Sequence, residues 1–134
     1  MSIAFDWAEK PGNVFTSDRA ERALLGALLL TGESGLARCE RLRPDDFRSP
    51  RGAAVLTAIR KLTFLGVTVD ALTVVDELER GKVPPPPAGP GWGTAIAALL
   101  DHGTVGACDD DSIGAYAQIV VDAAALRRRS AWGA

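Results

Sequence analysis

The sequence is poor in the residues that small catalytic and metal sites need. It contains two cysteines and one histidine. Cys39 and Cys108 are too few and too far apart for a zinc motif or a disulfide framework, and neither has a neighbour that would activate its thiol. His102 lies in a segment that we expect to be an interhelical loop, without a partner base or nucleophile. We therefore expect no catalytic residues, no metal site and no cofactor.

Aromatic residues, excess basic charge and long apolar runs are also scarce. Only 6% of the residues are aromatic, so the core must be mostly aliphatic. The net charge of −2 lacks the basic field of a typical DNA-binding domain, and we do not expect strong direct DNA binding. The N-terminus lacks the positive charge of a signal peptide, and no apolar run approaches the roughly 20 residues of a membrane span. These absences favour a cytoplasmic protein.

The abundant residue types favour helices. The chain has 134 residues, enough for one domain, and 47% of them are hydrophobic, chiefly alanine and leucine. Residues 1–16 show no helical or strand period and are expected to form a flexible arm. The domain is expected to span residues 17–134, with globular helices over 17–81, a proline-rich linker over 82–91 and a helical hairpin over 92–131.

The first two expected helices have recognisable beginnings. Asp18 and Glu21 have the spacing of a capping box, and the leucines that follow predict a largely buried helix in which Leu30 widens the apolar surface. Gly32 should end that helix, and Ser34 can begin a short second one.

The third helix is the clearest. The turn before it should place Phe47 in the core, Ser49 can cap the helix, and Pro50 suits its first position. An inner apolar stripe should then run to Gly66 along Val55, Ile59, Leu62 and Leu65.

The fourth helix should begin at the cap Asp70 and end at Gly81, although Val67–Val69 could form a strand. Its apolar face is either Leu72, Val75 and Leu78, or Val74 and Leu78. The prolines that follow exclude helix and favour a stiff extended segment. Composition favours a spacer over a polyproline ligand, and both interpretations stay open.

The last two helices are expected to pair as an antiparallel hairpin. The apolar surface of the final helix exceeds what one packed face requires, which suggests a partner. The residues that we expect at a self-association or partner interface are Ile96, Leu99, Leu100, Ile113, Tyr116, Ile119 and Val120.

Three further motifs have a plain structural interpretation beside a functional one. Gly89 to Gly93 lack a phosphate-binding lysine and a preceding strand, so a turn is favoured over a nucleotide site. Asp109 to Asp111 are better explained by helix capping than by cation binding. The cluster Arg127, Arg128 and Arg129 suits the C-terminal end of a helix dipole, but it could also contact nucleic acid or an acidic partner.

Four segments in this order resemble the N-terminal domain of the DnaB-type replicative helicases: AERALLGALLL, LRPDDF, AIRKLTFLGVTVDALTVVDEL and IGAYAQIV. The matching positions are Ala20, Glu21, Leu25, Gly26, Leu29, Leu42, Pro44, Asp46, Phe47, Ile59, Leu62, Gly66, Val69, Asp70, Thr73, Val74, Leu78, Tyr116, Ala117 and Val120. Arg51 departs from a frequent histidine of the family, and the proline-rich 83–91 replaces a shorter connection.

The resemblance implies an all-α fold, a compact multi-helix domain with a C-terminal antiparallel helical hairpin. It also implies head-to-head pairing, a place in the collar of a hexameric helicase, and contacts with primase or a helicase loader. The chain contains no motif of the helicase motor, so we expect no ATPase activity. We expect a stand-alone homologue, with a fragment as the other possibility.

The leading hypothesis is a non-catalytic, replication-associated interaction module that forms a homodimer or higher oligomer and engages helicase, primase or a loader. The alternative is a small helical DNA-binding regulator that uses Arg127 to Arg129.

Overall fold

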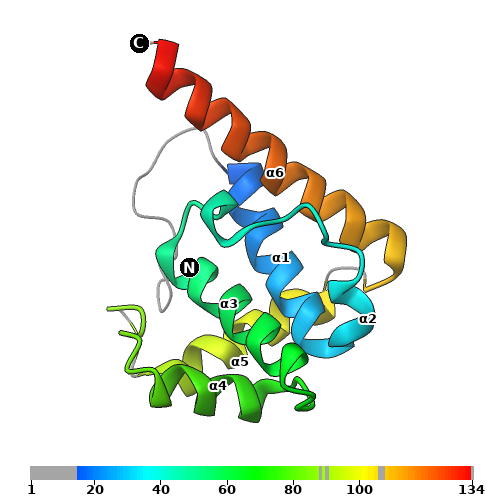
Figure 1. Ribbon diagram of the computed structural model, residues 1–134, viewed down its shortest axis with the longest axis vertical. Coiled ribbons are helices and arrows are strands. Elements are labelled where there is room, and N and C mark those ends of the chain that lie inside the picture. Colours follow the sequence, from blue (N-terminus) through cyan, green and yellow to red (C-terminus); the bar gives the residue numbers. More distant parts are fainter. Residues whose placement is uncertain (1–14, 88, 90, 106–107, 134) are drawn as a thin grey trace.

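The fold is all-helical over the residues that the computed structural model describes, which are 15–87, 89, 91–105 and 108–133 (Figure 1). The elements are α1 (Phe15–Thr31), α2 (Glu33–Leu36), the 3-10 turn η1 (Pro44–Asp46), α3 (Pro50–Phe64), α4 (Ala71–Arg80), α5 (Trp92–Val105) and α6 (Asp110–Gly133). The expected arm falls mostly outside the described residues, and α1 begins at Phe15, before the expected boundary. The possible strand at Val67–Val69 does not form.

Helix α1 is the centre of the molecule. It packs against α2, α3, α5 and α6, and Figure 1 shows it between α6 on one side and α3, α4 and α5 on the other. Leu24, Leu25 and Leu28 are fully buried in this position. One core cluster includes side chains from α1, α3, α4, α5 and α6, so every main helix contributes to the same interior.

The beginnings of α3 and α4 are as the sequence predicts. Ser49 Oγ accepts a hydrogen bond from the backbone N–H of Gly52 at 3.3 Å, and Pro50 is the first residue of α3. Asp70 caps α4 by accepting from the N–H of Thr73 at 2.9 Å, and Thr73 Oγ1 accepts from the N–H of Asp70 at 3.0 Å. These reciprocal bonds satisfy amides that the first helical turn leaves free.

The expected cap of the first helix is wrong. Because α1 begins at Phe15, Asp18 lies inside its first turn and cannot be the residue before the helix. The short second helix forms, and it begins at Glu33, one residue before Ser34. Gly32 has a φ of +64°, a left-handed conformation that glycine adopts without strain, and this makes the sharp turn between the two helices.

The turn η1 fixes the position of Phe47, which is buried as expected. A Cβ atom on Gly52 would lie 2.9 Å from the Phe47 ring, so the absence of a side chain at Gly52 allows the ring to pack directly on α3.

The proline-rich segment folds back on the domain. The indole N–H of Trp92 donates to the carbonyl of Val83 at 2.8 Å, and the Trp92 side chain is buried. The two ends of this segment are therefore held close together by the first residue of α5.

Helices α5 and α6 each use their main apolar face against α1. The main contacts of both helices are with α1 and not with each other. Figure 1 shows α6 crossing the body so that its last turns extend beyond it. None of the described helices is long and apolar enough to cross a membrane.

Candidate interaction surfaces

The structure divides the seven expected interface residues into two groups. Ile96, Leu99, Ile113 and Val120 are fully buried in the core. They face the interior because α5 and α6 both pack on α1, and they cannot also offer a surface to a partner. These four residues are therefore removed from the expected interface. The other three, Leu100, Tyr116 and Ile119, are only partly buried.

A partly exposed apolar flank runs along α6. Tyr116, Ile119, Ala123 and Leu126 recur at helical spacing on one side of the helix, next to the buried stripe. Leu126 is 60% exposed. We call these four residues the α6 flank.

The arginine cluster is mostly occupied within the domain. Arg127 donates to the backbone carbonyl of Asp46 at 2.9 Å, and Arg128 donates to the Asp46 carboxylate at 2.9 Å. Asp46 also accepts from the backbone N–H of Arg43 at 2.9 Å. Two of the three arginines therefore hold α6 against η1, and Arg129 remains exposed. The sequence did not predict this role for Arg127 and Arg128.

A second polar cluster joins α1 to the segment before α3. The Arg48 guanidinium forms an ion pair with Asp18 at 3.0 Å, and both side chains are largely buried. The backbone N–H of Arg48 donates to Glu21 Oε2 at 2.8 Å. Asp18 and Glu21 thus act together, but they bind the chain 30 and 27 residues further on and do not form the expected capping box.

Glu21 has an unusual environment for a carboxylate. Its side chain is 4% exposed, and burial raises its pKa from 4.5 to about 7. The nearby negative charge of Asp18 adds to this rise, while hydrogen bonds from the backbone of Arg48 and Ser49 and the positive charge of Arg127 oppose it. Ionisation of Glu21 is therefore linked to the contact between α1 and the start of α3.

The residues weighed for chemistry lie in unreactive settings. Burial raises the pKa of the Cys39 thiol to about 11, which disfavours a thiolate. Asp109 accepts from the N–H of Ser112 at 2.8 Å and so caps α6, and this bond helps to lower its pKa. Asp110 forms an exposed ion pair with Arg38 at 2.7 Å. Across the described ranges, no cluster of three potential metal ligands forms.

Two further expectations concern α5. His102 lies inside this helix, because α5 continues to Val105, and the expected interhelical loop is therefore shorter than predicted. In the glycine-rich string, Gly91 directly precedes α5, and Trp92 and Gly93 are the first residues of that helix, in agreement with the expected lead-in to a helix.

Sequence reasoning missed one surface altogether. Leu65 was expected to face inward but is exposed. Of the two faces considered for α4, the one with Val74 and Leu78 is buried, and Leu72 of the other is exposed. Leu30 and Phe64 are exposed nearby at the ends of α1 and α3. The signal was present in the sequence, since the spacing of Leu72 from Val74 and Leu78 puts it on the opposite side of an ideal helix.

The described residues form an all-helical fold in which α6 carries a partly exposed apolar flank beside its buried stripe. Residues 15–122 match the family of the DnaB-like helicase N terminal domain. The chain is also similar to the N-terminal domain of DnaB helicase from Mycobacterium tuberculosis, with 33% identity and a TM-score of 0.72 over 86% of this chain and 78% of that one. The chain belongs to the DnaB-like helicase N-terminal domain family, a non-catalytic domain of DNA replication.

Proposed function

We propose that the chain is a cytoplasmic, non-catalytic module of DNA replication that self-associates through the α6 flank and engages a replicative helicase, a primase or a helicase loader. The observation that carries this proposal is the α6 flank itself. Its apolar side chains continue beyond the residues that the core buries, to the exposed Leu126. Burying such side chains in a second copy removes apolar area from water, at about 25 cal/mol per Å².

The α6 flank also replaces the interface expected from the sequence. It keeps Tyr116 and Ile119 from that list and adds Ala123 and Leu126, and it needs no opening of the core. A helix with one face on its own domain and a neighbouring apolar face partly free is suited to pairing with another helix.

Light scattering over a concentration series tests self-association. We expect wild type to be a dimer or higher oligomer, and Ile119→Asp to shift it toward monomer because a carboxylate would be buried without a partner. Ala125→Asp is the matched control, since this exposed residue lies about 120° from Ile119 around the helix. A wild type that stays strictly monomeric at high concentration would remove the self-association part of the proposal.

A pull-down with purified helicase, primase and loader tests the partner part. Recovery of at least one of them supports it, and recovery of none removes it. The DNA-binding alternative has less support, because Asp46 already engages Arg127 and Arg128. It predicts affinity for DNA that falls steeply with salt, and a lack of binding at low salt excludes it.

A further inference from the structure

Five exposed apolar side chains lie at or near the ends of α1 and α3 and the beginning of α4. Phe64 is 89% exposed and Leu72 is 79% exposed, and the others are Leu30, Leu65 and Val67. We call these five residues the apolar corner. Among the residues whose burial the structure describes, the only other large hydrophobic side chain exposed to this degree is Leu126, on the α6 flank.

Helix geometry explains why the core does not cover this corner. Phe64 lies about 140° around α3 from the buried Ile59, and Leu72 lies about 160° around α4 from the buried Val74. Small rotations of either helix would therefore not bury them. Several large apolar side chains exposed on neighbouring elements of a small domain are a marker of a protein contact.

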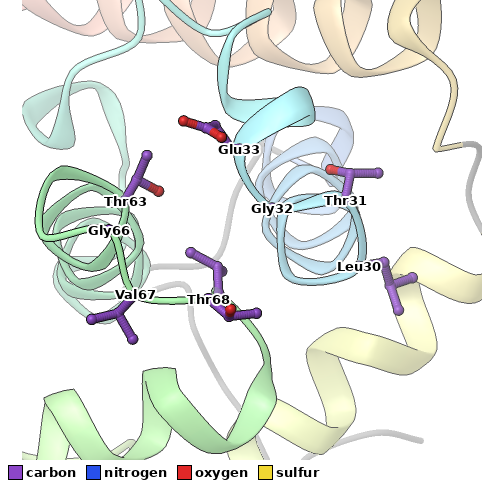
Figure 2. A pocket seen from close by; sticks show the side chains of 9 residues that line it. Leu30, Thr31, Gly32, Glu33, Thr63, Gly66, Val67 and Thr68 are labelled. Carbon is purple, nitrogen blue, oxygen red and sulfur yellow. The ribbon is translucent and has the colours of Figure 1, made fainter.

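The apolar corner borders an open hollow of about 340 Å³ between the end of α1 and the α3–α4 connection. Figure 2 shows Thr63 of α3 and Glu33 of α2 on opposite sides of it, with Val67 and Thr68 on the connection below. Leu30 and Val67 belong both to the hollow and to the apolar corner. The corner thus combines exposed apolar side chains with an open hollow beside them.

The charged side chains around the corner are mainly acidic. Residues 62–79 contain four acidic side chains, with Lys61 and Arg80 directly before and after this stretch, and Glu33 adds a further negative charge across the hollow. Lys61 pairs with Glu77 at 2.8 Å, and Arg80 pairs with Asp76 at 3.0 Å. Within the described part of the chain, Glu33, Asp70 and Glu79 form no ion pair with a basic side chain. Glu79 also lies on the same outer face of α4 as Leu72.

The acidic charge limits the kinds of molecule that can bind at the apolar corner. An acidic rim repels the phosphates of nucleic acid and the headgroups of anionic lipid, so neither fits the corner. A protein segment that combines apolar anchors with lysine or arginine satisfies both the apolar side chains and the rim. Amphipathic helices bind in this way when their apolar face enters a groove.

We propose that the apolar corner binds a basic amphipathic helix of a partner protein, with Phe64 and Leu72 as the central contacts. The inference deepens the proposed function, on which it rests, by naming the chemistry of the partner segment. It uses a surface separate from the α6 flank, so partner binding and self-association can occur on the same molecule.

The probe is a labelled helical peptide of leucine and lysine with one apolar face, compared with a leucine and glutamate peptide of the same pattern. Fluorescence anisotropy should show binding of the lysine peptide and at least tenfold weaker binding of the glutamate peptide. In an NMR titration with the lysine peptide, the chemical-shift changes should concentrate at residues 30–33 and 63–72. Equal binding of both peptides, or shifts spread over the whole surface, would overturn the proposal.

Substitutions then separate apolar contact from general charge attraction. Phe64→Ser and Leu72→Ser should each weaken binding of the lysine peptide at least fivefold, while Ala97→Ser on exposed α5 surface should not. Glu79→Gln should weaken it about twofold at low salt and less at high salt, with Glu40→Gln as the exposed control. Circular dichroism confirms that each variant is folded. Unchanged affinity in Phe64→Ser overturns the proposal.

The same samples distinguish this inference from the proposed function. Light scattering reports self-association through the α6 flank, and anisotropy reports peptide binding at the corner. If Phe64→Ser abolishes self-association and the lysine peptide does not bind, the corner is an interface between copies of this chain and the proposal is wrong.

Discussion

Replacing Glu21 by glutamine should flatten the pH dependence of stability. The folded protein holds the Glu21 proton more tightly than the unfolded chain does, because its pKa is about 7 in the fold and 4.5 as a free side chain. The contribution of this proton is complete below pH 4.5 and is lost as the pH rises to 7. At 1.36 kcal/mol per unit, the loss is roughly 3 kcal/mol of unfolding free energy.

Urea unfolding followed by circular dichroism at pH 5 and pH 7.5 measures this loss. Wild type should lose roughly 2 to 3 kcal/mol between the two, and Glu21→Gln should lose less than about 1 kcal/mol. The difference between the two proteins cancels the contribution of other groups that titrate in this window. Glutamine keeps an acceptor for the Arg48 amide, so the variant should still fold. Parallel pH profiles for wild type and Glu21→Gln would refute the buried-carboxylate argument.

Two further substitutions test how the helices are held together. Gly52→Ala would place a methyl group 2.9 Å from the Phe47 ring, and overpacking of this kind should lower the unfolding free energy by about 1 to 3 kcal/mol. Ala54→Gly, a helical control, should lower it by only about 1 kcal/mol, and a smaller effect for Gly52→Ala would mean that the ring moves freely. Asp46→Ala removes the acceptor for Arg128 and for the Arg43 amide, and should lower stability by about 2 kcal/mol. An unchanged urea midpoint for Asp46→Ala would show that the contacts of the Asp46 side chain contribute nothing to stability.

The sequence allowed good prediction of features that depend on near neighbours. Ser49 and Asp70 cap their helices because the amides they bind lie three residues away. Gly32 ends α1 because the turn there needs a positive φ. Such local arrangements follow from residue type and spacing, and the family resemblance then supplies the order of the helices.

Features set by tertiary packing were harder to predict. Amphipathic spacing shows that Ile113 and Val120 share a face of α6, but not that α1, and not a second copy, covers that face. The partners of Arg127 and Arg128 lie 81 and 82 residues away in the sequence, so only the fold brings them to Asp46. A single sequence gives no measure of that proximity.

Sedimentation equilibrium of wild type and Leu126→Glu over the same concentrations tests most directly whether this domain associates through the α6 flank. The account predicts that wild type associates and that Leu126→Glu weakens association at least tenfold, since it places a charge where an apolar contact forms. Equal association constants for the two proteins, or a wild type that remains monomeric throughout, would contradict it.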